Sequence, residues 1–469
     1  MSSMFRSLSR YNYRLWFAGA LVSNIGGWMQ STTQDWVVLT ELTHNNATAV
    51  GVTMALQFGP QLALVPLTGA VIDRFDRRKV LLVTQTVLML LAVGLGLLLL
   101  GGHAELWHVY GFALALGIAN AFDAPARQTF VSDVVQGADA ANAIALNAAS
   151  FNAARMIGPA TAGLLIVLVG SGWVFLINAA TFLAMLAAIL LLRKDELAAR
   201  PRTRRPGNAL AQGFRYVRSR GDLTVVFLIV FLMGAFGMNF PIFNSTMAVM
   251  FGEGAGEYGV VSSILAIGSL TGALLAARRE RARLRIVLGG AALFGAAALI
   301  ASVMPTYGTF AASTILIGFS SVTLLTTANG FVQTTTPDDV RGRVMAIYTA
   351  VLMGSTLVGA PVVGWVADAM NARAGLGVAS VAGFLSCAIG LGWLVSKRGL
   401  RLVRAPESRW RFEVAWVETA DASGVGVTPA SRRAPAAPED FSDEIALTSP
   451  IPLPKLPTAT GPIGQPRGA

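Results

Sequence analysis

The sequence has 469 residues, of which 54% are hydrophobic and 13% are charged, with a net charge of +11 and a mean hydropathy of +0.60. A soluble chain carries roughly 25% charged residues, so this composition excludes an ordinary soluble protein and indicates one that crosses a membrane repeatedly. The one cysteine, Cys387, excludes an internal disulfide and a cysteine-cluster metal site, and no lysine stands in a GK[ST] phosphate-binding loop.

A helix that spans a bilayer needs about 20 apolar residues. The sequence offers twelve candidates, at about 14–40, 48–72, 80–101, 106–128, 140–169, 172–192, 223–251, 257–277, 286–304, 308–334, 343–367 and 376–396. The N-terminal MSSMFRSLSRYNYR runs into the first candidate without a small-residue cleavage site. We therefore expect it to begin a spanning helix and not to be a removed signal peptide.

Lysine and arginine gather in alternate loops. Twenty of them lie in 73–79, 193–220, 278–285 and 341–343. The intervening loops hold one, Arg373. Because short cytoplasmic loops collect these residues, both termini are expected in the cytoplasm. The loops also account for the basic charge without nucleic acid as a partner.

The two halves of the sequence repeat. Gly69-Ala-Val-Ile-Asp73 has a degenerate echo in Gly272-Ala-Leu-Leu-Ala276, at an offset of 203, and the glycines of Gly158-Pro159-(x)3-Gly163 recur in Gly359-Ala-Pro361-(x)2-Gly364 at an offset of 201. This spacing predicts an all-α membrane protein whose twelve transmembrane helices form two pseudo-symmetric six-helix bundles.

Four regions follow from this division. They are an N-terminal bundle at 1–192, a cytoplasmic linker at 193–222, a C-terminal bundle at 223–396 and a disordered cytoplasmic tail at 397–469. In the linker, Leu210, Phe214 and Val217 at helical spacing predict an amphipathic helix on the membrane surface. The tail is rich in proline, and its alternating segment 409–418 could form one strand, although a lone strand is not stable.

The loop Gly69-(x)3-Asp73-Arg74-x-Asp76-Arg77-Arg78-Lys79 resembles the cytoplasmic motif G-x-x-x-D-R-x-G-R-R/K of the major facilitator superfamily. Gly158-Pro159 resembles the Gly-Pro motif of its exporters. The segments 121–130, 147–165 and 340–354 resemble the subgroup of enterobactin exporters and bacterial multidrug exporters. The resemblance covers about 1–396. Asp76 replaces the usual glycine of the motif, and the second-half loop RRERARLR lacks the aspartate.

The resemblance implies a gate in which Asp73 docks on the N-terminus of the eleventh helix, with Arg74 and Arg77 as braces. Thr336-Pro337-Asp338-Asp339 is a good start for that helix. Because Asp338 and Asp339 already complement its dipole, we expect Arg74 or Arg77 to pair with one of them. The alternative is a solvated charged turn that only fixes topology.

Gly158 and Pro159 weaken the main-chain hydrogen bonding of the fifth helix. The resemblance implies a bending point that favours release to the outside. The alternative, ordinary close packing of a membrane helix, is equally compatible with the sequence.

Charged residues inside spans are functional hypotheses by default. Asp35, on a face with Asn24, Trp28 and Ser31, is the first candidate for proton coupling, although it lies close enough to the interface to be solvated. Arg155 must be paired or line a wet cavity. Asp123 and Arg127, four residues apart, complete the coupling candidates and can equally form a structural ion pair.

The second half has uncharged polar side chains in its spans instead of charged ones. The candidates for the substrate cavity are Asn24 and Trp28 in the first half, and Asn239, Asn244, Asn329 and Gln333 in the second. The sequence contains no metal-ligand cluster and no nucleophile–base pair, so an enzyme, a cofactor and a metal are not expected.

The resulting hypothesis is a secondary transporter of the bacterial inner membrane. It would be a monomer that exports a hydrophobic or amphiphilic small molecule, such as a drug or siderophore, in exchange for protons. An importer or facilitator of a small metabolite is the alternative within transport. A membrane receptor or scaffold whose tail recruits partners is the alternative outside it.

Overall fold

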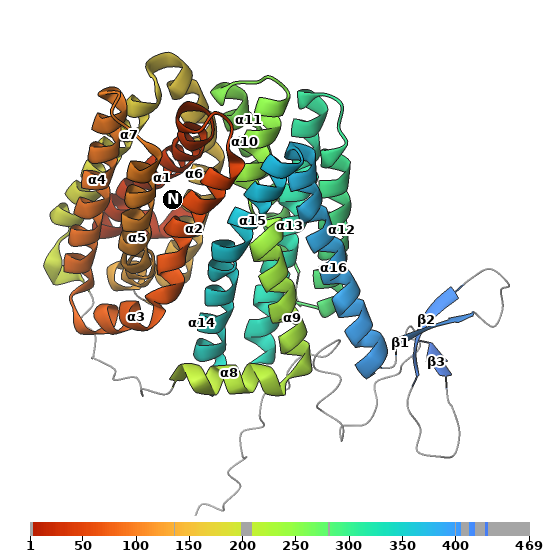
Figure 1. Cartoon of the computed structure of the whole chain (residues 1–469). Coiled ribbons are helices and arrows are strands. Elements are labelled where there is room, and N and C mark those ends of the chain that lie inside the picture. Colours follow the sequence, from red (N-terminus) through yellow and green to blue (C-terminus); the bar gives the residue numbers. More distant parts are fainter. Residues whose placement is uncertain are drawn as a thin grey trace, which may run out of the picture.

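The computed structural model describes residues 3–135, 137–197, 209–279, 282–398, 400–404, 412–417 and 427–429. Helices dominate these residues, in two groups that stand side by side (Figure 1). The first half comprises α1 (Tyr11–Trp36), α2 (Ala47–Ala63), α3 (Val65–Arg74), α4 (Arg77–Leu100), α5 (Leu106–Val134), α6 (Ala140–Val169) and α7 (Ser171–Leu191). The second half comprises α9 (Gly221–Leu232), α10 (Phe240–Met250), α11 (Ala255–Ala277), α12 (Leu284–Ser302), α13 (Tyr307–Thr335), α14 (Asp338–Gly354), α15 (Thr356–Ala369) and α16 (Ala372–Arg398).

Three predicted spans are interrupted. The span at 48–72 breaks at Leu64 between α2 and α3, where Pro60 and Pro66 weaken the helix. The span at 223–251 passes from α9 through the π-helical turn Met233–Gly237 to α10, and the span at 343–367 breaks at Ser355. The predicted boundaries of the fifth span, 140–169, are those of α6.

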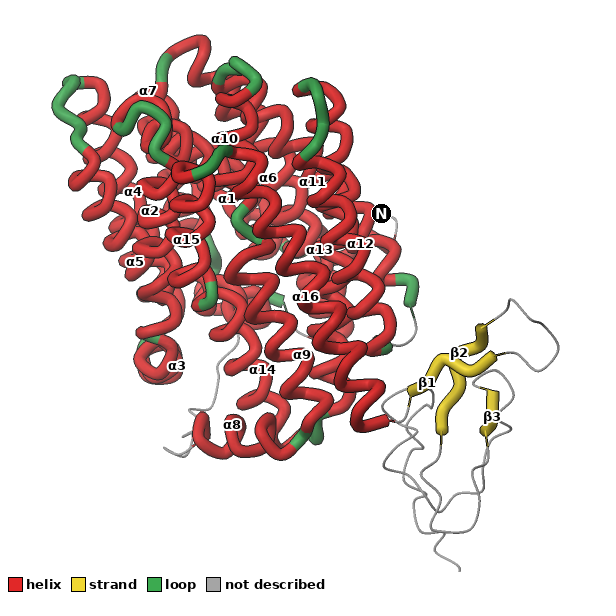
Figure 2. Tube along the Cα trace, turned by 45° about the vertical axis from the view of Figure 1, so that its right-hand side comes forward, coloured by secondary structure: helices red, strands yellow, loops and turns green. Residues whose placement is uncertain are grey.

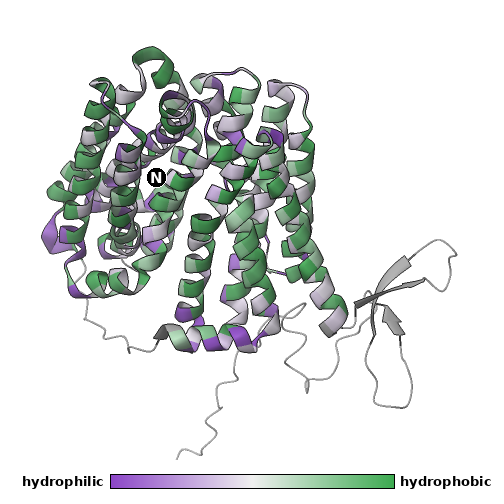
Figure 3. Cartoon of the chain, viewed as in Figure 1, coloured by the Kyte–Doolittle hydropathy of each residue, from purple (hydrophilic) through white to green (hydrophobic). Residues whose placement is uncertain are grey.

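Ten of the described segments are long and apolar enough to cross a membrane. α1, which carries many polar side chains, and α2, with 17 residues, are not among them. The structure is therefore that of a helical membrane protein, and the count of twelve spans stays a prediction. Figure 3 shows mostly hydrophobic residues on the helices and hydrophilic residues along much of α8 (Ala209–Ser219).

The predicted amphipathic helix is present as α8, which lies across one end of the second half (Figure 1). Val217 is buried, whereas Phe214 is 61% exposed. The side chain of Leu210 lies outside the described residues. Helices α4, α6, α12 and α14 begin at this end of the molecule, which we call the basic end. Helices α2, α5 and α11 begin at the other end, which we call the opposite end.

The N-terminus is fastened to the basic end. Arg10 donates two hydrogen bonds to Asp139, at 3.1 and 2.9 Å, and Arg6 pairs with the same carboxylate. These hydrogen bonds hold the pKa of Asp139 below its ordinary value.

The two halves meet chiefly through α2 with α15 and α6 with α11, and α2 also contacts α14 and α10 while α1 contacts α10. At the basic end, α3 packs against α5 of its own half, and α14 packs against α8 and α9. Figure 1 shows α3 and α14 apart from each other at this end. The main contacts between the halves thus lie toward the opposite end, where Gly163 and Gly364 pack against the other half.

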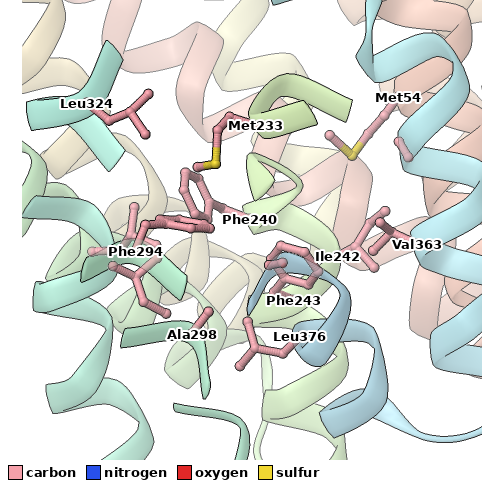
Figure 4. Close-up of a cluster of buried hydrophobic side chains, with 14 of the residues drawn as sticks. Met54, Met233, Phe240, Ile242, Phe243, Phe294, Ala298, Leu324, Val363 and Leu376 are labelled. Carbon is pink, nitrogen blue, oxygen red and sulfur yellow. The ribbon is translucent and has the colours of Figure 1, made fainter. Parts of the chain in front are cut away.

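The largest hydrophobic core lies in the second half and reaches into the first. It contains Phe240, Phe243 and Phe294 together with Met54 of α2 and Val363 of α15 (Figure 4). The contact between the halves is therefore continuous with the second-half core.

Past α16, the structure differs from the predicted disordered tail. β1 (Leu400–Arg404), β2 (Phe412–Val417) and β3 (Val427–Pro429) form an antiparallel sheet in the order β1-β2-β3, outside the helices (Figure 2). The alternating segment predicted as a possible strand supplies β2, and pairing on both sides removes the objection to a lone strand. The rest of 397–469 beyond α16 lies outside the described residues.

Candidate functional site

Asp35 is buried at the junction between the halves, with 3% of its surface exposed. The hydroxyl of Tyr258 on α11 donates a hydrogen bond of 3.5 Å to its Oδ2. The neighbouring Trp36 stacks on the Tyr258 ring, with 5.7 Å between centroids. The expectation that interfacial water would solvate Asp35 does not fit this burial. Its charge state bears directly on the contact between α1 and α11.

Asp123 and Arg127 form the ion pair that their spacing predicts, at 2.7 Å. The second Asp123 oxygen accepts hydrogen bonds from Thr84 and Gln85 of α4, each at 2.7 Å. All of these groups are buried or nearly so. The Asp123 carboxylate is thus fully engaged within the first half, as a structural ion pair would be.

The same Arg127 reaches across to α1. It donates hydrogen bonds to Ser23 Oγ at 3.0 Å and to Asn24 Oδ1 at 3.3 Å. Through these bonds the predicted cavity residue Asn24 is tied to the Asp123–Arg127 pair.

Arg155 of α6 lies over the ring of Trp28, one turn along α1 from Asn24, with its guanidinium carbon 5.7 Å from the ring centroid. Phe151 packs edge-on against the same indole, with 5.8 Å between centroids. Two of the predicted residues, Trp28 and Arg155, are therefore brought together. Arg155 has no carboxylate partner among the described residues.

The polar candidates of the second half do not gather with these residues. Asn239 donates to the Ala235 carbonyl at 2.6 Å beside the π-helical turn, and Asn244 donates to Ser262 at 3.3 Å. Gln333 donates to Asn329 at 2.7 Å, close to the basic end of α13. The structure thus assigns these four amides local partners and gives no support for one shared cavity.

Glycine residues let the halves approach closely at the opposite end. Gly163 of α6 faces the carbonyls of Ala255 and Gly256 at the start of α11, and Gly259 of α11 faces Pro159 in return. A Cβ atom at either glycine would overlap main-chain atoms of the other half.

The second junction is built in the same way. Gly364 of α15 faces Ala47 at the start of α2, and Gly51 of α2 faces Ala360 and Pro361 in return. Gly163 and Gly364, which the predicted repeat relates at an offset of 201, therefore occupy equivalent places in the two junctions.

Gly158 also packs closely, against Trp28 and the α1 main chain, and α6 continues as one α-helix through Pro159. The structure therefore shows close helix packing at Gly158-Pro159. A bend of functional importance at Gly158-Pro159 stays a prediction.

Asp368 closes the α2–α15 junction and was not among the sequence candidates. Its two carboxylate oxygens accept hydrogen bonds from the main-chain N–H groups of Ala47 and Thr48, at 2.7 and 2.8 Å, and from the Thr48 hydroxyl at 2.5 Å. These are the first free amides of α2, where the helix dipole favours an anion.

The loop at the basic end is held within the first half in this conformation. Arg77 pairs with Asp133 of α5 at 2.9 Å, and Arg78 donates to the carbonyls of Ile189 and Leu190 at the end of α7. Asp76 caps α4 by accepting from the Arg78 N–H at 2.9 Å, which gives the substitution of the usual glycine a local role.

The residues of the eleventh helix that were predicted to pair with Arg74 or Arg77 have other contacts in this conformation. α14 begins at Asp338 as predicted, with Asp338 and Asp339 in its first turn, but Asp338 pairs with Arg341 at 2.5 Å. Arg74 lies over the Phe75 ring. Gly69 lies in α3, and a Cβ there would meet nothing within 4 Å; the Asp73 side chain lies outside the described residues.

No local feature of the sequence indicated that Tyr258 and Asp368 contact the other half. Each is 223 or more positions from its partner, and Asp368 was grouped with the loop residues beyond the eleventh span. Arg373, the one cation of the opposite loops, donates to the carbonyls of Ser302 and Met304. Within the described part of the chain, no three His, Cys, Asp or Glu side chains are arranged to hold a metal ion.

Comparison with known proteins agrees with this architecture. A family model described as "Transmembrane secretion effector" matches residues 2–420. The multidrug efflux pump Tap of Mycolicibacterium fortuitum is 25% identical over 76% of this chain and 89% of its own length. The staphyloferrin A transporter of Staphylococcus aureus is 24% identical over 71% and 84%, and the enterobactin exporter EntS of Salmonella typhimurium is 25% identical over 76% and 85%.

Solved structures share the fold. A bacterial homologue of the lysosomal transporter Spinster, in an inward-facing and unoccupied conformation, has a TM-score of 0.63 at 15% identity, over 81% of this chain and 96% of that chain. The nucleoside transporter NupG also has a TM-score of 0.63, at 13% identity, over 82% and 98%. The family match extends past the predicted limit of about residue 396. The chain belongs to the transmembrane secretion effector family of the major facilitator superfamily, and it is a multi-pass membrane transporter and not an enzyme.

Proposed function

We propose that this transporter exports a hydrophobic or amphiphilic small molecule in exchange for protons, by alternating access between its two halves. The single observation that carries the proposal is the burial of Asp35 between the halves, where the phenol of Tyr258 on α11 is its partner. The efflux pump and the siderophore exporter among the relatives support the direction of transport and the class of substrate.

The topology that we propose has twelve spans in two bundles, with the basic end in the cytoplasm. The repeated glycine junctions, α2 with α15 and α6 with α11, support two equivalent units. The concentration of Lys and Arg at one end supports its cytoplasmic placement. In this arrangement the structure corresponds to a conformation closed toward the outside.

Asp35 would couple the proton to this closure. A carboxylate that stays charged in a dry contact costs several kcal/mol, and protonation removes most of that cost. The closed junction is therefore compatible with a protonated Asp35. Opening toward the outside would hydrate Asp35 and allow it to exchange its proton there.

The test uses inverted membrane vesicles that contain the full-length protein, with an imposed pH gradient, acid inside. Two fluorescent probes of related ring structure, anionic fluorescein and cationic tetramethylrhodamine methyl ester, cover both signs of charge. We expect gradient-dependent accumulation of at least one probe above vesicles that lack the protein. We also expect Asp35→Asn to abolish the dependence on the gradient.

Glu253→Gln, which removes a carboxylate from the turn before α11, is the matched control and should keep the dependence. If the wild-type protein transports the probes equally with and without the pH gradient, proton coupling is rejected in favour of a facilitator. Full coupling in Asp35→Asn, at equal amounts of protein, would reject Asp35 as the coupling residue.

A further inference from the structure

We propose that Arg155, together with Trp28 and Phe151, forms a subsite for a negatively charged oxyacid group of the substrate. The ligand class is an amphiphilic anion that carries a carboxylate beside an aromatic ring. This inference rests on the proposed function, which leaves the charge of the substrate open.

The first step is the charge balance around α6. The helices and short segments that pack against α6 carry five carboxylates on their described residues, and each one is engaged elsewhere. These are Asp35 with Tyr258, Asp123 with Arg127, Asp133 with Arg77, Asp139 with Arg6 and Arg10, and Glu257 with the Gly254 N–H.

The second step is the cost of the unbalanced charge. A guanidinium does not lose its proton in proteins, so Arg155 stays cationic near the middle of a membrane helix. Its described contact is the Trp28 ring, with the guanidinium carbon 5.7 Å from the ring centroid. A cation–π contact offsets only part of the cost of placing a cation at this depth in a membrane. An anionic ligand group would supply the missing compensation.

The third step is geometry. Trp28 lies between Asn24, which Arg127 holds, and Asp35, two turns further toward the opposite end. A molecule that approached along α1 from the basic end would meet Trp28 before it met Asp35. Arg155 as a residue is half-buried.

The chemistry of the three side chains specifies the ligand. The planar fork of a guanidinium matches the two oxygens of a carboxylate. The rings of Trp28 and Phe151, inclined by 64°, present aromatic surface next to that fork. A ligand with an acid group attached to an aromatic ring fits both features at once.

The test is equilibrium binding, without a gradient, to the purified full-length protein in lipid nanodiscs. Fluorescence anisotropy of fluorescein and of tetramethylrhodamine methyl ester compares an anion and a cation built on related rings. We expect wild type to bind fluorescein, and Arg155→Gln to weaken that binding by about tenfold or more. The cationic ester should bind the variant at least as well as it binds wild type.

Arg155→Lys keeps the charge without the fork and should lie between wild type and Arg155→Gln. Arg14→Gln, which removes an exposed arginine from the basic end of α1, should bind fluorescein as wild type does. Thermal unfolding of each variant confirms that the comparison is made between folded proteins.

The proposal is overturned if wild type binds fluorescein no more tightly than Arg155→Gln does. It is also overturned if Arg155→Gln weakens both probes equally, because that result would reflect packing and not charge. Gradient-driven transport of the cationic ester, unaffected by Arg155→Gln, would leave the proposed function intact while the anion subsite fails.

Discussion

The carboxylate of Asp368, at the end of α15, accepts both the main-chain N–H and the hydroxyl of Thr48, at the start of α2. The loop motif implies the reverse arrangement at the basic end, where Asp73 at the end of α3 would dock at the start of α14. One pair of predicted spans, α2–α3 and α14–α15, thus carries a carboxylate latch at the opposite end and the residues for a second latch at the basic end. Alternation between these latches would close one side of the transporter at a time.

Replacing Asp368 should release the observed latch. Asp368→Asn keeps the shape and removes the charge that complements the first turn of α2, and loss of a capping interaction of this kind costs about 0.5–2 kcal/mol. We expect the population to shift toward opening at the opposite end. Distances between spin labels at His103 and Pro305, in a Cys387→Ala background, should become longer.

The control for this shift is Asp195→Asn, which removes an exposed carboxylate from the basic end. Its distance distribution should match that of the unmodified background. An unchanged distribution in Asp368→Asn would mean that the glycine contacts alone hold the junction.

The glycine junctions should tolerate no side chain. A Cβ at Gly51 or Gly259 would overlap the main chain of the other half, and overpacking of this kind costs about 1–3 kcal/mol. Gly51→Ala and Gly259→Ala should therefore lengthen the same label distance, and Gly111→Ala, where a Cβ meets nothing within 4 Å, should not. Equal distances in all three variants would contradict the close approach seen here.

Glycine spacing was the strongest sequence signal for this architecture. The offset of 201 between Gly158 and Gly359 reflects equivalent packing, because Gly158 faces α1 and Gly359 faces the Ala235 carbonyl in the π-helical turn that follows α9. Local rules also found the start of α14, from the Pro-Asp-Asp sequence, and the ion pair of Asp123 with Arg127, from its spacing of four.

Contacts between the halves were beyond such rules. Asp368 and Tyr258 gain their importance from partners more than 200 residues away, and no local periodicity encodes that proximity. The break at Leu64 was also missed, although Pro60 and Pro66 stand on either side of it. Asn329 and Gln333 appeared to be cavity residues because polarity alone does not reveal that they bond to each other.

The Asp123–Arg127 pair should behave as a structural unit. Asp123→Asn would leave a buried guanidinium without its counter-ion, and breaking such a pair costs about 3–5 kcal/mol. We expect a marked loss of thermal stability. Arg127→Gln combined with Asp123→Asn should restore part of it, since the stranded charge is then gone. A stable Asp123→Asn protein that has lost only proton dependence would instead identify Asp123 as a coupling residue.

Arg77 should exchange partners between the two conformations. In the structure it pairs with Asp133. The sequence predicts that Arg74 or Arg77 pairs with Asp338 or Asp339, and we take Asp338 as the partner of Arg77 when the basic end closes. Asp133→Asn should therefore favour closure of the basic end, and Asp338→Asn should favour its opening, because each change removes the partner from one state only. Spin labels at Lys79 and Arg285 should move closer together in the first variant and further apart in the second. If both variants shift the distance in the same direction, Arg77 does not exchange partners, and the charged loop serves topology alone.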